Sequence, residues 1–259
     1  MKNSNQKSKL QEADFIRHKL FEEKKSSLRK YSELTIGSYS LLGLLKYEVF
    51  TSLIGLLPGA FGLFTRRILY PSLTYNCGRG VIWGRSISIR HPGKLSVGNR
   101  VVIDDYSLLD ARGSGDEGVV IGDDVFIGRN VTIQSKVGSI SIGKSTNIGQ
   151  NTVIVAQGGV QIGEMVTIAG GCSISGGAYK VERDSTSNRE HSKYTYGPIR
   201  IDKKCRLGME VMVLDGVHIG EGTIIGAKSL ITKDLPEYCV AAGIPAEIKY
   251  YRENGKKDS

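Results

Sequence analysis

Residues 121–154 read IGDDVFIGRNVTIQSKVGSISIGKSTNIGQNTVI, and an isoleucine returns in this stretch at every sixth position with one short interruption. The same period extends over residues 97–231. It matches neither a helix, which repeats about every 3.6 residues, nor a strand, which repeats about every 2. Six-residue repeats are typical of a parallel β-helix, in which each hexad forms one face and turns a corner. We therefore predict an all-β fold of stacked triangular coils.

The repeat also predicts how the coils pack. The lead aliphatic residue of each hexad points inward, and a small or β-branched residue lies four positions later in most hexads. We expect the glycine after the lead to permit backbone angles that a Cβ forbids at a tight corner. About four or five coils fit the span. A flat β-sandwich is the alternative fold, and the fixed six-residue register argues against it.

Composition limits the classes of partner. The chain has 259 residues, 40% of them hydrophobic, a net charge of +9 and a pI of about 9.3. This charge favours anionic partners such as phosphates or anionic lipids. Nucleic-acid binding is not expected, because the basic residues are not interleaved with an aromatic stacking platform. The four cysteines include no CxxC pair, and Cys172 and Cys205 fall at inward positions. This indicates a reducing cytoplasm, without a disulfide framework or zinc site.

We divide the chain into a helical amino-terminal region (1–75), a β-helix domain (76–252) and a polar tail (253–259). Residues 1–30 are polar and charged, so we expect a solvated arm and no signal peptide. Residues 34–73 show a strongly apolar helical pattern that is interrupted at a Pro-Gly pair.

Two roles for the apolar helical segment remain open. It forms interfacial helices at a membrane surface, or it caps the otherwise exposed edge of the first coil. A transmembrane span is disfavoured, because the uncharged run 49–65 is only marginally long and contains Pro58. In the interfacial arrangement, four arginines face lipid headgroups: Arg66, Arg67, Arg79 and Arg85.

Two polar stretches interrupt the repeat, and a third lies before it. The longest, 178–198, leaves the core between two regular coils and carries many groups suited to site chemistry, so we expect it to be functional. The loop that begins at Asp110 and Arg112 is expected to be solvated. His91 belongs to an Arg-His-Pro-Gly sequence and is expected to be a turn residue.

The carboxy-terminal part resembles a known family. Residues 197–252, GPIRIDKKCRLGMEVMVLDGVHIGEGTIIGAKSLITKDLPEYCVAAGIPAEIKYYR, resemble the signature of the hexapeptide-repeat acyltransferases. More narrowly, they are similar to O-acetyltransferases of the surface-polysaccharide, maltose and serine type, and the resemblance covers about residues 87–252. It implies a left-handed coil, against the usual right-handed rule for parallel crossovers. It also implies a homotrimer with active sites between subunits and acetyl-CoA as co-substrate.

In this family a histidine acts as general base on the acceptor hydroxyl, and a backbone N–H stabilises the developing oxyanion. The histidine usually lies just after the coil that precedes the long loop. Tyr179 occupies that place here, so we take His191 in the loop as the candidate base and Tyr179 as a residue that positions the acceptor. Tyr179 as base would be handicapped by an ordinary pKa near 10. His218 is expected at the surface, and His18 lies in the arm.

The resemblance also assigns the cofactor residues. Small residues permit close approach of coenzyme A to the coils, and lysines complement its phosphates. Lys228 replaces a small residue of the family and either obstructs pantetheine or binds a phosphate, and Arg206 replaces a common tryptophan. The cofactor-binding candidates are Gly208, Met209, Gly226, Ala227, Lys228, Thr232 and Lys233.

We expect an acetyl-CoA-dependent O-acetyltransferase, without a metal, that acts on a sugar hydroxyl of a surface polysaccharide or a lipid-linked saccharide. It would work in the cytoplasm, at the inner face of the cell membrane. The alternative is a non-catalytic trimeric β-helix scaffold that has lost the catalytic base. A γ-type carbonic anhydrase is disfavoured because it needs three zinc-binding histidines, and only His218 lies within a coil.

Overall fold

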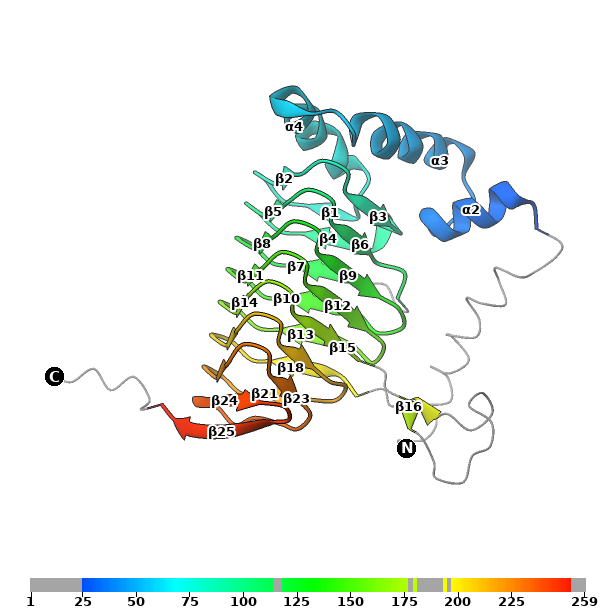
Figure 1. Ribbon diagram of the computed structural model, residues 1–259. Helices are drawn as coiled ribbons and strands as arrows, with labels where there is room; N and C mark the ends of the chain where they lie inside the picture. The colour runs from blue at the N-terminus through cyan, green and yellow to red at the C-terminus, as the bar shows by residue number, and fades with distance from the viewer. Residues whose placement is uncertain (1–24, 114–117, 177–178, 181–192, 195–196, 253–259) are drawn as a thin grey trace.

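A computed structural model describes residues 25–113, 118–176, 179–180, 193–194 and 197–252. They form a three-faced parallel β-helix, with helices across its amino-terminal end and an antiparallel hairpin at the other end (Figure 1). The β-helix is left-handed and has about 6 turns, which confirms the predicted fold class.

Each face is a parallel sheet that takes one strand from each coil. The first face contains β1 (Asn76–Cys77), β4 (Leu95–Val97), β7 (Val119–Ile121), β10 (Ile140–Ile142), β13 (Val160–Ile162), β18 (Ile199–Ile201) and β21 (His218–Ile219). The second contains β2 (Ile82–Trp83), β5 (Val102–Ile103), β8 (Phe126–Ile127), β11 (Asn147–Ile148), β14 (Thr167–Ile168), β19 (Arg206–Leu207) and β22 (Ile224–Ile225), and ends in the hairpin of β24 (Cys239–Gly243) and β25 (Ala246–Tyr251). The third contains β3 (Ser88–Arg90), β6 (Leu108–Asp110), β9 (Thr132–Ser135), β12 (Val153–Ala156), β15 (Ser173–Ser175), β20 (Met212–Val213) and β23 (Leu230–Ile231).

The lead aliphatics stack in register and form the core. Ile121 pairs with Ile142, Ile142 with Ile162, and Ile162 with Ile201, and each is at most 3% exposed. The last pairing spans the long insertion, so the insertion leaves the stack unbroken. Within the described residues the first and third faces each have seven strands, more than the four or five coils predicted. The reason is that coils begin at Asn76, ahead of the regular hexads.

The glycine after each lead residue does not serve the purpose that we predicted, which was to adopt backbone angles that a Cβ forbids. Gly122 and Gly143 follow leads, yet the left-handed φ angles occur elsewhere, for example at Asp124 (φ 58°), three residues after its lead. A Cβ on Gly143 would lie 2.4 Å from the carbonyl carbon of Gly163 in the next coil. Glycine is therefore needed after the lead because adjacent coils approach closely. The left-handed positions are occupied by residues of several kinds, among them Asp124, Asn130 and Met165.

The amino-terminal helices cap the first coil. They are α2 (Ser27–Thr35), α3 (Leu41–Glu48), the π-helix η1 (Val49–Ile54), α4 (Gly59–Leu69) and the 3-10 helix η2 (Tyr70–Ser72). The fully buried rings of Tyr70 and Trp83 pack edge to face, 5.5 Å between centroids. The Tyr47 hydroxyl donates to the carbonyl of Ile89 at 2.7 Å. The predicted capping role is thus confirmed.

Arg66 does not face lipid headgroups, contrary to expectation. It is only 3% exposed. Its Nε donates to the carbonyl of Trp83 at 3.0 Å and its Nη1 to that of Leu57 at 2.7 Å. The helical segment is interrupted at Pro58, which leaves nearby carbonyls without hydrogen-bond partners in a helix. The Arg66 guanidinium donates hydrogen bonds to these carbonyls.

His91 is a turn residue, as predicted, and it also holds the cap. Its φ of 51° precedes the 3-10 turn η3 (Pro92–Lys94). Its backbone N–H donates to the carbonyl of Thr35 at 2.7 Å, and its Nε2 lies 3.0 Å from the carbonyl oxygen of Glu33. Burial lowers the pKa of His91, so this contact is made by a neutral imidazole.

The prediction that the loop beginning at Asp110 is solvated was wrong for the first residues of that loop. The Asp110 side chain is 1% exposed and pairs with Arg112, Nε to Oδ1 2.8 Å. Gln134 of the next coil donates to Asp110 at 3.1 Å. A buried carboxylate needs such partners, so the pair anchors the corner from which the loop leaves.

Candidate functional site

The long insertion leaves and rejoins the prism at the corner where the third face meets the first. Gly176 follows β15, and Gly197 precedes β18. The N–H of Gly197 donates to Asp215 Oδ2 at 3.1 Å, and a Cβ on Gly176 would lie 2.8 Å from Asp215 Oδ1. One carboxylate from the next coil therefore lies against both ends of the insertion. Sequence reasoning missed this role, although Asp215 lies within residues 197–252, the stretch that carries the family resemblance.

The predicted catalytic residues belong to this insertion. Tyr179 begins β16 (Tyr179–Lys180), which pairs antiparallel with β17 (Lys193–Tyr194), Tyr179 opposite Tyr194. The backbone of Tyr179 therefore follows Gly176 by three residues, close to the corner that Asp215 occupies. His191 lies outside the described residues, and its assignment as base stays a prediction.

Five predicted cofactor residues meet at one corner of the last coils, between the second and third faces. They are Gly208 and Met209 after β19, and Gly226, Ala227 and Lys228 after β22. A Cβ on Gly208 would lie 2.6 Å from the backbone nitrogen of Ala227, and the N–H of Lys228 donates to the carbonyl of Met209 at 2.7 Å. The Lys228 side chain is 75% exposed, its Nζ 3.6 Å from a Glu210 oxygen. At this corner the backbones of two adjacent coils lie close together, and the exposed Lys228 side chain provides a positive charge beside them.

Thr232 and Lys233 lie elsewhere. They follow β23 at the corner between the third and first faces, the same corner as Gly176 and Asp215, and both are exposed. A ligand that contacts both predicted groups has to cross the third face, where Met212 is 45% exposed beside Leu230. The seven predicted cofactor residues are therefore divided between two corners.

A basic pocket of about 470 Å³ opens on the second face near the same coils. Lys204, Arg206 and Arg252 contribute its cations, and Tyr238 lines it. Arg252 Nη1 donates to the carbonyl of Gly222 at 2.8 Å, which fixes this guanidinium. Lys204, Arg206 and Arg252 were not predicted as binding residues. The signal available in the sequence was the replacement of the family tryptophan by Arg206.

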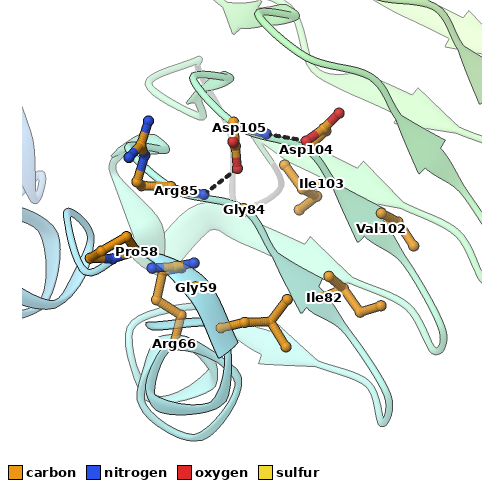
Figure 2. Close-up of a pocket in the computed structure, with 11 residues that line it drawn as sticks. Pro58, Gly59, Arg66, Ile82, Gly84, Arg85, Val102, Ile103, Asp104 and Asp105 are labelled. Atoms are coloured by element: carbon orange, nitrogen blue, oxygen red, sulfur yellow. Dashed lines mark hydrogen bonds between the residues drawn. The ribbon is translucent and has the colours of Figure 1, made fainter. Parts of the chain in front are cut away.

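A second pocket, of about 480 Å³, lies between α4 and the first strands of the second face (Figure 2). Its two carboxylates accept hydrogen bonds from the backbone: Asp105 accepts from the N–H of Arg85, and Asp104 accepts from the N–H of Asp105, each at 2.7 Å. The Arg66 guanidinium donates hydrogen bonds to carbonyl groups of the cap. No predicted site residue lines this pocket, which belongs to the junction of the cap and the prism.

His218 lies on the outside of the first face, as predicted, with its side chain 48% exposed. Its Nε2 is 2.9 Å from Oδ2 of Asp202, a pairing that the sequence did not predict. Among the residues that the structure describes, no group of three or more His, Cys, Asp or Glu side chains is arranged to hold a metal ion.

Two family models match the coils. "Bacterial transferase hexapeptide (six repeats)" matches residues 198–233. "Hexapeptide repeat of succinyl-transferase" matches residues 111–138 and 139–175. Together they match coils on both sides of the long insertion.

Among similar proteins, the galactoside O-acetyltransferase of Escherichia coli is 33% identical over 47% of this chain and 61% of its own length. The putative colanic acid biosynthesis acetyltransferase WcaF of Escherichia coli is 32% identical over 47% of this chain and 66% of its own. The chain thus spans less than two thirds of these relatives. The crystal structure of a mutant of AntD, an N-acyltransferase from Bacillus cereus, has a TM-score of 0.52 at 19% identity, covering 72% of this chain and 88% of that one, and supports the fold. The coil geometry, the repeat models and these relatives together support the hexapeptide-repeat acyltransferase family for this chain.

Proposed function

We propose that the protein is an acetyl-CoA-dependent O-acetyltransferase that acts on a sugar hydroxyl of a surface polysaccharide or a lipid-linked saccharide. The observation that carries this proposal is the corner of the last coils at Gly208 and Ala227, where small residues leave the backbone accessible: Ala227 is exposed and Gly208 is half-buried. Such a corner admits a slender pantetheine chain and offers backbone groups to it. The names of the galactoside and colanic acid relatives support a saccharide acceptor and an acetyl donor.

The proposed reaction needs a base, an oxyanion donor and a held thioester. The base takes the hydroxyl proton as the acceptor oxygen attacks the thioester carbonyl. The tetrahedral intermediate collapses, the C–S bond breaks, and the thiolate of coenzyme A leaves and takes up a proton. We assign the base to His191 and the placement of the acceptor to Tyr179. A backbone N–H near the insertion corner stabilises the oxyanion.

Cations around the last coils suit the phosphates of coenzyme A. Lys228 and Lys233 lie at the two corners that border the third face. The basic pocket with Arg206 adds a further cluster on the second face. We propose a homotrimer, because the two corner groups on one subunit then meet the faces of its neighbours and complete a groove. AntD was crystallised with coenzyme A, which supports the same donor class here.

A non-catalytic trimeric scaffold is the second candidate. The observation that favours it is Tyr179 at the position where the family usually has its histidine. A phenol with an ordinary pKa near 10 is a poor base at neutral pH, so Tyr179 would not replace a lost histidine base.

The two candidates are separated by measuring acetyl-CoA binding by calorimetry and thiol release against a panel of sugar acceptors. An enzyme binds the donor and releases thiol only with its acceptor, whereas a scaffold gives neither signal. The His191→Ala variant should lose at least about 100-fold in kcat with little change in donor affinity. His18→Ala, in the amino-terminal arm, is the matched control. Full rates in both His191→Ala and Tyr179→Phe would show that the site assignment is wrong.

A further inference from the structure

The outer surface of the helical cap carries a continuous row of exposed apolar side chains, which we call the cap stripe. Its members are between 36% and 81% exposed. They lie on α3, on η1 and the turn after it, and on α4, which adjoin one another at one end of the prism (Figure 1). The cap stripe consists of Leu42, Leu45, Val49, Leu53, Leu56, Phe61, Phe64 and Ile68.

The spacing of the cap stripe is helical. From Leu42 to Leu56 and again from Phe61 to Ile68 its residues follow one another at intervals of three or four, which places them on one side of each helix; the interval of five between Leu56 and Phe61 spans the interruption at Pro58. The opposite side is buried on the prism: Tyr47 bonds to the first coil, and Gly62, Arg66 and Tyr70 follow at intervals of four. The helices are therefore buried on one side and apolar on the exposed side, and capping explains only the buried side. An exposed patch of this size marks an interaction surface, because scattered surface leucines do not line up.

The charges nearby suit an anionic surface. Residues 25–75 contain six Lys or Arg and two Glu, a net charge of +4, and none of these charges falls within 49–65. One of the six, Arg66, is buried in the cap and is not available to such a surface. Arg67 is exposed next to Ile68 and has no ion-pair partner within the described part of the chain. Lys46, beside Leu45, is also exposed, and its Nζ donates to the carbonyl of Ser72 in η2 at 2.7 Å. Apolar side chains bordered by cations are the pattern of an interfacial helix.

The place of the stripe in the fold suits docking. Figure 1 shows the cap at the end of the prism opposite the β24–β25 hairpin, so contact there leaves the last coils and their corners open to solvent. Among the described helices none is long and apolar enough to cross a membrane, so contact through the stripe would be peripheral. In the proposed homotrimer, three parallel prisms would present three caps to the same plane, and multivalent contact strengthens weak binding.

We propose that the cap stripe docks on the surface of an anionic phospholipid bilayer, with its apolar side chains among the acyl chains and Arg67 at the headgroups. The prism then stands off the membrane and holds its last coils toward the aqueous side. This inference rests on the cap alone. If the acyltransferase activity proposed above is correct, docking keeps the enzyme where lipid-linked saccharides are found.

The test is co-sedimentation of the full chain with vesicles of phosphatidylcholine alone and vesicles that also contain phosphatidylglycerol. We expect binding to the anionic vesicles that weakens at high salt. The double variant Leu45→Glu/Leu53→Glu should lower the partition coefficient by at least about 100-fold. The reason is that two leucine side chains no longer insert among the acyl chains. The matched control is Ile244→Glu/Tyr250→Glu, which makes the same charge change at similarly exposed residues of the hairpin, 74% and 61%.

Each outcome decides the proposal. Binding that survives in the stripe variant, or a wild-type chain that stays in the supernatant with both vesicle types, overturns it. Light scattering is run in parallel: if the stripe variant changes the oligomeric mass, the stripe is a contact between copies and the lipid proposal is wrong. Thermal melting establishes that both variants fold. Thiol release with a water-soluble acceptor should be equal in wild type and variant, so failure of docking and failure of the enzymatic proposal are distinguished.

Discussion

Small polar side chains at the second inward position of the hexads bond to the coil next to them. Thr146 donates to the carbonyl of Gly163 at 2.9 Å, and Thr223 to that of Pro236 at 2.7 Å. The Cys172 thiol lies 3.2 Å from the carbonyl oxygen of Gly208, and the Cys205 thiol 3.1 Å from that of Gly220. These side chains are close to valine in size, and they also donate hydrogen bonds to carbonyl groups at the corners of the next coil. Each buried polar group therefore has a partner, and the bond fixes which coil lies next to it.

Asp215 gives the first prediction at this scale. Asp215→Ala should leave the Gly197 N–H without its acceptor, lower the unfolding free energy by about 1 kcal/mol and loosen the base of the insertion. Limited proteolysis should then cut the insertion faster, and urea unfolding gives the energy. Asp215→Asn keeps an acceptor oxygen and should resemble wild type. Equal proteolysis of the alanine variant and wild type would mean that the carboxylate does not hold the insertion.

Cys205 gives a prediction for pH dependence. Burial raises the pKa of its thiol from 9.0 to about 12. The unfolded chain loses this proton above pH 9 while the folded chain keeps it, so the stability due to the neutral thiol is present below pH 9 and is lost as pH rises toward 12. The slope is at most about 1.4 kcal/mol per pH unit.

Urea unfolding at pH 8 and pH 10 tests this dependence. Cys205→Ala should show a smaller decrease than wild type, while Tyr70, whose pKa burial also raises to about 12, contributes equally to both. Identical slopes in the two proteins would contradict the assignment of this pH dependence to the thiol.

At the scale of elements, the cap depends on a guanidinium where a helix break leaves carbonyls exposed to the interior. The break at Pro58 allows α4 to turn across the first coil, and Arg66 reaches the carbonyls of Leu57, Ile54 and Trp83. Burial lowers the pKa of Arg66, and three carbonyl acceptors offset the cost of that burial.

Arg66→Met should therefore destabilise the fold by about 2–4 kcal/mol, since it leaves buried carbonyls without donors. Arg67→Met changes the same residue type one position along, on the exposed side of α4, and should alter stability by less than about 0.5 kcal/mol. Urea unfolding of the two variants makes the comparison. Equal stability of both would show that the carbonyls find other donors.

At the scale of the molecule, the prism presents large apolar side chains on its outer faces as well as on the cap. Phe126 is 42% exposed on the second face, and Val153 and Met212 are 38% and 45% exposed on the third. These faces are long and regular, so identical prisms can pack side by side along them.

A homotrimer is accordingly expected in solution. Light scattering should give three times the protomer mass of 28.2 kDa at micromolar concentration. Val153→Glu at the centre of the third face should shift the mass toward the monomer if that face is in the interface, because a charge is buried there without a partner. Asn147→Glu, on the second face, tests the other surface. A monomeric wild-type protein would contradict the proposed groove between subunits.

The sequence by itself determined the prism. A six-residue period admits one way of stacking inward aliphatics, so the inward positions and the buried cysteines were predictable, and so was the outward His218. The cofactor candidates came from resemblance, and the fold placed five of them together.

The tertiary structure decided what depends on distant residues meeting. Arg66 looked like a surface cation because its carbonyl partners lie nine to seventeen positions away, and Asp110 looked solvated because Gln134 comes from the next coil. Asp215 reaches the insertion for the same reason. Periodicity records which way a side chain points, whereas a hydrogen bond between coils depends on which coil lies next to it, and only the stacked chain fixes that neighbour.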